Sequence, residues 1–155
     1  MNLVDELHAI ARALRDAGVD YAVCGGIAVT IYGATRTTKA IDLLLPPAEV
    51  PRTLDLLRSL GYRFAALPMT FDEGTPKERH VQRVTKIDGG DHLILDLLVA
   101  DASLASFLDG RQEIPLEEGA LRVVSLPSLL QMKRLAGRPQ DLADLAALEG
   151  LADAP

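Results

Sequence analysis

Two carboxylates stand alone inside apolar segments of this chain. Asp42 lies near the start of the strand-like run Ile41–Leu45, and Asp96 interrupts the otherwise apolar segment His92–Val99. Asp42 is out of place in a core strand, and because an isolated buried charge costs several kcal/mol, Asp96 needs a partner such as a metal ion or a basic group. For Asp96 the alternative is a structural role, with an arginine as its partner or a loop to cap.

The segment before Asp42 has the layout of a phosphate-binding site. A short apolar run, Tyr21–Cys24, is broken by Gly25-Gly26, and the residues that follow can form two helical turns before Gly33. Glycines let the backbone pass close to a ligand, and the start of a helix offers unpaired N–H groups to an anion. A polar loop, 35–39, then leads to the strand that carries Asp42.

The order of these residues resembles a known signature. Gly25-Gly26, thirteen residues and then a strand with Asp42 look like the DNA polymerase β-like nucleotidyltransferase superfamily, in particular its minimal and AbiEii-type members of bacterial toxin–antitoxin and abortive-infection systems. In that signature an Asp-x-Asp or Asp-x-Glu pair follows the glycines. Residues i and i+2 of a strand share a face, so two such carboxylates can hold two divalent ions. Here the position of the first aspartate is Ala40.

The resemblance implies a fold, cofactors and a set of site residues. The implied fold is α+β with an α/β-like core, in which a mixed central sheet is flanked by helices and followed by C-terminal helices. The implied ligands are an NTP and Mg²⁺ or Mn²⁺, with metal bound by Asp42 and Asp96 and with Ala40 at the third catalytic position. The nucleotide would be bound by Gly25, Gly26, Arg36, Thr37, Thr38 and Lys39.

The C-terminal segment extends the resemblance. Lys133 on a predicted helix, followed by Arg138, Asp141 and Asp144, looks like the AbiEii-type pattern of a lysine helix and then Arg-x-x-Asp-x-x-Asp. Carried over, Lys133 would neutralise the triphosphate, and Asp141 would orient that lysine or contact the nucleotide. Arg138 and Asp144 would support this corner. Alone, Arg138 with Asp141 could equally be an ordinary i,i+3 ion pair, and Asp144 alone does not indicate a site.

Ala40 implies an impaired enzyme. Mg²⁺ requires oxygen ligands, so a methyl group cannot replace the first aspartate, and we expect turnover to fall by orders of magnitude. Ala40 could mark a natural pseudo-enzyme or an engineered inactive form of an active, toxic enzyme; the intact polar groups around it favour the second interpretation. With aspartate at position 40, that residue and Asp42 would bridge two Mg²⁺ ions, and Asp96 would help to deprotonate the acceptor hydroxyl.

The implied reaction is transfer of a nucleotide from an NTP to an acceptor hydroxyl, with pyrophosphate leaving. The toxin–antitoxin resemblance suggests RNA, such as a tRNA 3′ end, or a hydroxyl of a partner protein; antibiotic-modifying relatives suggest a small molecule. A non-catalytic antitoxin or regulator on a dead transferase fold is the second hypothesis. A third is that Asp42 and Asp96 are structural acids of an unrelated α/β domain.

Composition narrows the class of protein. The formal charge of −6 gives no general attraction to nucleic acid, so RNA contacts need a local basic patch, from Arg79, Arg83 and Lys86 or from Lys133, Arg134 and Arg138. The length of 155 residues fits a single domain over 1–155. No run is long and apolar enough to span a bilayer, and the first residues lack signal-peptide character, which predicts a cytoplasmic protein with no membrane partner.

Periodicity and turn residues predict the elements that position these groups. Helices are expected over 2–17, 25–33, 48–60, 126–136 and 139–149, with a short helix within 101–110. Strands are expected over 20–24, 40–45, 62–66, 79–87, 92–99, 113–116 and 121–124. The segment 69–77 is predicted to be a loop, 88–91 a tight hairpin turn, and 113–124 a peripheral hairpin.

Overall fold

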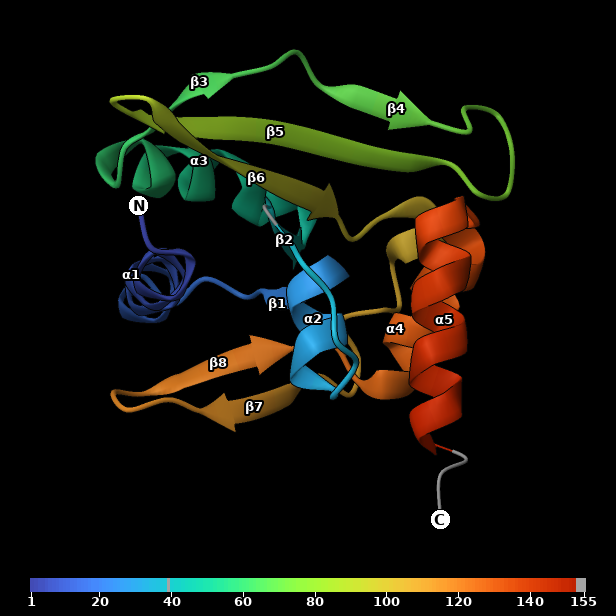
Figure 1. Ribbon diagram of the computed structural model, residues 1–155. Coiled ribbons are helices and arrows are strands. Elements are labelled where there is room, and N and C mark those ends of the chain that lie inside the picture. Colours follow the sequence, from blue (N-terminus) through green and yellow to red (C-terminus); the bar gives the residue numbers. More distant parts are fainter. Residues whose placement is uncertain (39, 153–155) are drawn as a thin grey trace.

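The computed structural model describes residues 1–38 and 40–152. In this part of the chain one mixed sheet has eight strands in the order β3-β5-β6-β2-β1-β8-β7, with β4 also paired to β5 (Figure 1). The strands are β1 Ala22–Cys24, β2 Ala40–Leu45, β3 Tyr62–Ala65, β4 Met69–Phe71, β5 Arg79–Asp88, β6 Asp91–Val99, β7 Gln112–Pro115 and β8 Ala120–Val123. The predicted mixed sheet is confirmed.

Helices lie on both sides of this sheet, as predicted. They are α1 Leu3–Asp16, α2 Gly25–Ile31, α3 Val50–Ser59, α4 Leu126–Ala136 and α5 Pro139–Ala152, with 3₁₀ turns η1 Pro47–Glu49 and η2 Ala102–Leu104. In Figure 1, α1 and α3 lie on one side, while α4 and α5 pack together on the other. None of the helices in the described residues is long and apolar enough to cross a membrane.

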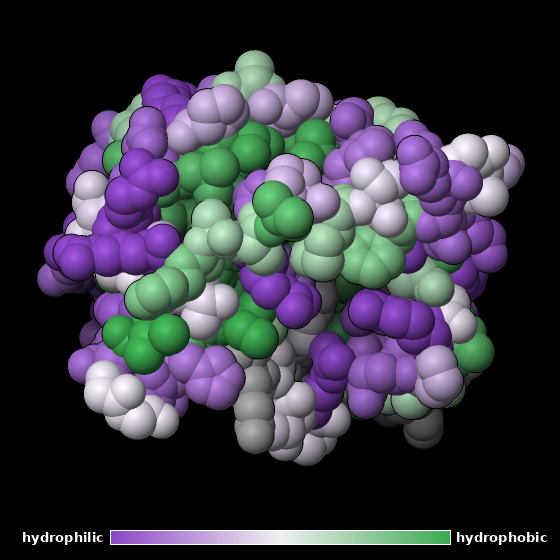
Figure 2. Space-filling model, turned by 90° about the horizontal axis from the view of Figure 1, so that it is seen from above, coloured by the Kyte–Doolittle hydropathy of each residue, from purple (hydrophilic) through white to green (hydrophobic). Residues whose placement is uncertain are grey.

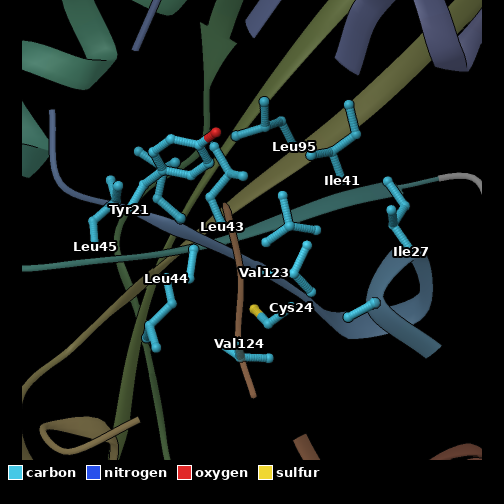
Figure 3. Close-up of a cluster of buried hydrophobic side chains, with 14 of the residues drawn as sticks. Tyr21, Cys24, Ile27, Ile41, Leu43, Leu44, Leu45, Leu95, Val123 and Val124 are labelled. Carbon is cyan, nitrogen blue, oxygen red and sulfur yellow. The ribbon is translucent and has the colours of Figure 1, made fainter. Parts of the chain in front are cut away.

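Strand β2 is the centre of the core. It runs antiparallel to β1 and parallel to β6, and Ile41, Leu43, Leu44 and Leu45 are fully buried. The close-up in Figure 3 shows these side chains packed with those of neighbouring strands. A strand so apolar is stable only between other strands, and the lone Asp42 is thereby held in a fixed place.

The hairpin of β5 and β6 is confirmed, with its turn at Gly89-Gly90. The prediction that 69–77 is a loop was wrong at its start, because Met69–Phe71 forms β4 and pairs antiparallel with β5. So short a segment has little strand signal of its own and is stabilised by the long neighbouring strand. The hairpin over 113–124 is less peripheral than predicted, since β8 pairs in parallel with β1.

The corner between α4 and α5 follows from its capping residues. The Ser125 hydroxyl accepts a hydrogen bond from the N–H of Ser128 (3.1 Å), and Gly137 ends α4 in the left-handed conformation with φ of 63°. Pro139 then begins α5, where its missing N–H is not needed. These caps, predicted from the sequence, place Lys133 and Arg138 at one end of the helix pair.

Candidate functional site

Asp42 and Asp96 occupy matching positions on adjacent strands. Asp42 pairs in register with Asp96 across the parallel β2–β6 ladder, so both side chains point to the same face. Arg83 of β5 pairs with Asp96 from the other side. Lys86, three residues on, faces the opposite side of β5 and forms an ion pair with Glu6 of α1. The carboxylates therefore lie on the sheet face turned away from α1.

Arg83 holds Asp96 with two hydrogen bonds. Its Nε lies 2.8 Å from Oδ1 and its Nη2 lies 3.0 Å from Oδ2, so the guanidinium contacts both oxygens. This fork is the basic partner that the sequence left open as an alternative to a metal ion. The remaining terminal nitrogen, Nη1, has no hydrogen-bond partner among the described residues and is free to donate to a ligand.

Asp42 lacks such a partner. Within 1–38 and 40–152, no ion pair or hydrogen bond holds its carboxylate. Burial, followed by the negative charge of Asp96, raises the pKa of Asp42 to about 6, against the opposing effect of Lys133, Arg138 and Arg36. A half-buried carboxylate whose pKa is raised in the folded state lowers stability at neutral pH, and a cationic ligand would relieve this cost.

The glycine pair makes room for the site. Gly25 has a φ of +65°, and a Cβ there would lie 2.1 Å from Oδ2 of Asp42. A Cβ on Gly26 would lie 2.4 Å from Nη1 of Arg36 and 2.9 Å from Oγ1 of Thr38. Any side chain at either position would displace these groups, so the glycines are needed for this packing as well as for the predicted approach of a phosphate.

An ion network centred on the buried Lys133, Asp141 and Asp144 lies beside the glycines. Nζ of Lys133 lies 3.3 Å from Oδ1 of Asp141 and 3.0 Å from Oδ2 of Asp144. Nε of Arg138 lies 2.7 Å from Oδ2 of Asp141, and Nε of Arg36 lies 3.4 Å from Oδ1 of Asp144. Three cations are thus oriented by two aspartates close to Gly26.

The charge of Asp141 is secured by these contacts. Burial alone would raise the pKa of Asp141, but the hydrogen bonds from Arg138 and the charge of Lys133 outweigh it and lower this pKa. The charged network is therefore kept at neutral pH, and the cations stay in place.

These groups line one open cleft between the sheet and the α4–α5 corner, hereafter the Asp42 cleft. The predicted site residues that line it are Gly25, Gly26, Arg36, Asp42, Asp96, Lys133, Arg138 and Asp141. Thr37 and Thr38 do not line it; the hydroxyl of Thr38 donates to the carbonyl of Ala40 (3.1 Å). Lys39 lies outside the described residues.

Neither predicted basic patch forms one surface. Arg79 and Arg83 line the cleft, while Lys86 faces α1. Lys133 and Arg138 also line the cleft, whereas Arg134 pairs with Glu149 on α5 (2.6 Å). These basic side chains are close in sequence but point in different directions, because successive residues of a strand face opposite sides and successive residues of a helix are rotated around its axis.

Sequence reasoning missed part of the site. Asp144, which indicated no site on its own, is buried and contacts Lys133 and Arg36. An apolar wall was also missed, because much of it lies on the unpredicted strand β4 and on β6 beyond Asp96. Its residues are Met69, Phe71, Val81, Leu98, Leu104 and Met132. One signal was available in the sequence: Val81 lies two residues from Arg83, and Leu98 two residues from Asp96, so each apolar side chain shares a strand face with a site residue.

The residues present fit one divalent cation that is shared with a nucleotide. In the described residues, no three His, Cys, Asp or Glu side chains gather closely enough to hold a metal by themselves. Mg²⁺ is commonly bound by one or two carboxylates together with the phosphates of a substrate, and the unpartnered Asp42 beside Asp96 supplies such a pair. Ala40 supplies no ligand.

Comparisons with known proteins address the fold. The sequence matches no protein-family model, and no curated protein matches it. A predicted nucleotidyltransferase of Thermotoga maritima superposes with a TM-score of 0.63 at 14% identity, covering 97% of this chain and 93% of that one. The antibiotic-resistance factor ANT(2″)-Ia, solved with adenylyl-2″-tobramycin, superposes with a TM-score of 0.58 at 16% identity, covering 94% and 86%.

The chain has a nucleotidyltransferase fold. The expected fold is thereby confirmed. At such low identity the likeness covers the fold alone. Membership of the AbiEii-type group and the roles of individual residues stay predictions.

Proposed function

We propose that the Asp42 cleft binds an NTP and that the protein is a metal-dependent nucleotidyltransferase whose turnover is weakened by Ala40. The observation that carries this proposal is the unpartnered Asp42, in register with Asp96 and packed against Gly25. A half-buried carboxylate without a cation is costly to keep, which supports a binding role for it.

In this proposal the triphosphate lies between Gly25-Gly26 and the cations Arg36, Lys133 and Arg138. Asp141 and Asp144 fix these cations, so little ordering is left to occur when the anion binds. Thr37, Thr38 and Lys39, also implied by the resemblance, follow Arg36 directly along the chain. Because Thr37 and Thr38 do not line the cleft, they would contact the nucleotide only at its rim or after the loop moves.

The chemistry would be an in-line displacement. The acceptor oxygen forms a bond to the α-phosphorus, the bond from this phosphorus to the bridging oxygen breaks, and pyrophosphate leaves. Asp96 accepts the proton of the acceptor hydroxyl and passes it to water. A divalent ion held by Asp42 and Asp96 would offset the charge that develops on the phosphoryl oxygens. Arg36, Lys133 and Arg138 stabilise the departing pyrophosphate.

Two observations favour the alternative of a non-catalytic nucleotide-binding or partner-binding module. Position 40 is alanine, and both oxygens of Asp96 are held by Arg83. A cleft in this state would bind nucleotide without transferring it. A role as a component of a toxin–antitoxin pair, with RNA or a partner protein as acceptor, is supported by the sequence resemblance. A role in antibiotic modification has the fold of ANT(2″)-Ia in its favour.

The decisive experiment replaces Ala40. Ala40→Asp should restore the missing ligand and raise incorporation of α-labelled NTP into a pool of RNA, protein and aminoglycoside acceptors by about 100-fold or more. Ala40→Asn is the matched control, because the side chain has the same shape without the charge, and it should stay at the level of the unchanged chain.

Circular dichroism serves to check that both variants keep the fold. If Ala40→Asp labels no acceptor while it remains folded and binds NTP, the enzymatic proposal is wrong and the binding module remains.

A further inference from the structure

The part of the apolar wall that lies on β4, β5 and β6 is on the far side of the reacting centre from the phosphate-binding cations; it consists of Met69, Phe71, Val81 and Leu98. Across the sheet, the cleft residues run from Gly25 beside β1, through Asp42 on β2 and Asp96 on β6, to Arg83 on β5. Strand β4 continues this row, because Phe71 pairs with Arg79 and Met69 pairs with Val81. All of these residues share the face that carries Asp42.

The geometry of in-line displacement decides which end of this row holds the leaving pyrophosphate and which end receives the acceptor. The attacking oxygen and the leaving pyrophosphate must lie on roughly opposite sides of the α-phosphorus. If pyrophosphate leaves towards Gly26 and Lys133, the acceptor approaches from β5 and β4. This step rests on the proposed function, since it takes the glycine end of the cleft as the triphosphate site.

We propose that Met69, Phe71, Val81 and Leu98, with Arg79 and Arg83, form an acceptor subsite. It takes the unpaired terminal base and adjacent phosphate of a single-stranded RNA rather than a polycationic small molecule.

The chemistry of this wall supports such a ligand. Phe71 is 41% exposed, and the guanidinium of Arg79 lies 5.7 Å from the centroid of its ring, which keeps the ring in place and leaves a face for stacking. Figure 2, which looks down on the side of β3 and β4, shows apolar patches among charged residues. Nη1 of Arg83 can donate to a phosphate while Nε and Nη2 hold Asp96.

A polycationic acceptor would need unpaired carboxylates here. The residues of β4 and β5 that line the cleft include no carboxylate. Asp72, which follows Phe71 in the chain, is already paired with Arg79 (2.9 Å). Asp96 and Asp141 are each held by an arginine. Of the acidic side chains lining the cleft, Asp42 alone lacks a salt-bridge partner within the described residues, and it belongs to the reacting centre.

Fluorescence anisotropy with a 5′-labelled, unstructured oligoribonucleotide that has a free 3′ hydroxyl tests this proposal on the full chain. Phe71→Ala should weaken binding of the oligonucleotide roughly ten-fold by loss of stacking, and Phe71→Leu should weaken it to a similar degree although apolar bulk is retained. Phe64→Ala is the matched control, because Phe64 is 59% exposed on β3 and does not line the cleft.

Binding of ATP, measured on the same variants, separates the possible failures. The proposal predicts that Phe71→Ala leaves ATP affinity within two-fold and that tobramycin does not compete with the oligonucleotide. It is overturned if Phe71→Ala weakens ATP instead, since the ring would then serve the nucleotide, or if the oligonucleotide is unaffected while ATP binds. If neither ATP nor any other NTP binds to any of the proteins, the proposed function fails and the subsite falls with it.

Discussion

The position of Asp42 conflicts with the stability of the fold. Its carboxylate is surrounded by a buried strand, a neighbouring aspartate and the backbone of Gly25, and the pKa of Asp42 is raised to about 6. A carboxyl group with a raised pKa in the folded state stabilises the protein while it is protonated. That stability is lost as pH rises from about 4 through 6, because the folded state must then hold the charge.

Replacement of this carboxylate should therefore stabilise the protein. Asp42→Asn should raise the free energy of unfolding at pH 8 by up to roughly 3 kcal/mol, which corresponds to the rise of the pKa from 3.8 to about 6. The gain should shrink towards zero near pH 4. Urea unfolding at both pH values measures it, with Asp55→Asn on the surface of α3 as control (side chain 77% exposed). No gain over the unchanged chain at pH 8, or the same gain at both pH values, would show that the charge of Asp42 does not destabilise the fold.

At the scale of elements, the turn from β1 into α2 is the joint that holds the site together. Two glycines of the chain have nearly the same positive φ, 67° at Gly18 and 65° at Gly25. They differ in their surroundings: a Cβ on Gly18 meets no atom within 4 Å, and one on Gly25 meets Asp42 at 2.1 Å. The pair separates the cost of the conformation from the cost of the close approach.

Alanine substitutions measure these two costs. Gly18→Ala should lower the free energy of unfolding by about 1 kcal/mol, the cost of a left-handed conformation. Gly25→Ala should lower it by about 3 kcal/mol or more and should also weaken NTP binding, because Asp42 must move. Thermal and urea unfolding of the two variants give the difference. Equal losses would mean that Asp42 does not pack on this glycine.

Elements with strong local signals could be predicted from the sequence, and those stabilised by their neighbours could not. The caps Ser125 and Gly137 and the hairpin turn at 88–91 are specified by the residue types at those positions. Strand β4 has three residues and depends on β5 for its hydrogen bonds. The site follows the same division: the glycine pair and Asp42 could be recognised by order, whereas the Arg83–Asp96 fork and the contacts of Asp144 arise only when strands and helices meet.

At the scale of the whole molecule, the net charge is negative, whereas the Asp42 cleft is lined by more basic than acidic side chains. The formal charge of the chain is −6, yet Arg36, Arg79, Arg83, Lys133 and Arg138 all line the Asp42 cleft. The acidic exterior repels nucleic acid in general, and the low-dielectric walls of a cleft concentrate the field of its cations. Anionic ligands are thereby directed to one place on the molecule.

The central claim is that this cleft binds an NTP through the cations beside its glycine pair. Titration calorimetry with each NTP in the presence of Mg²⁺ tests it on the unchanged chain, on Arg138→Gln and on Arg134→Gln. Arg138 lines the cleft and is 72% exposed, whereas Arg134 is 53% exposed and pairs with Glu149 away from it. A lost charged hydrogen bond corresponds to about ten-fold in affinity.

We predict that at least one NTP binds the unchanged chain, that Arg138→Gln weakens this binding about ten-fold or more, and that Arg134→Gln leaves it unchanged. No binding of any NTP, or equal binding by the two variants, would contradict the assignment of the Asp42 cleft.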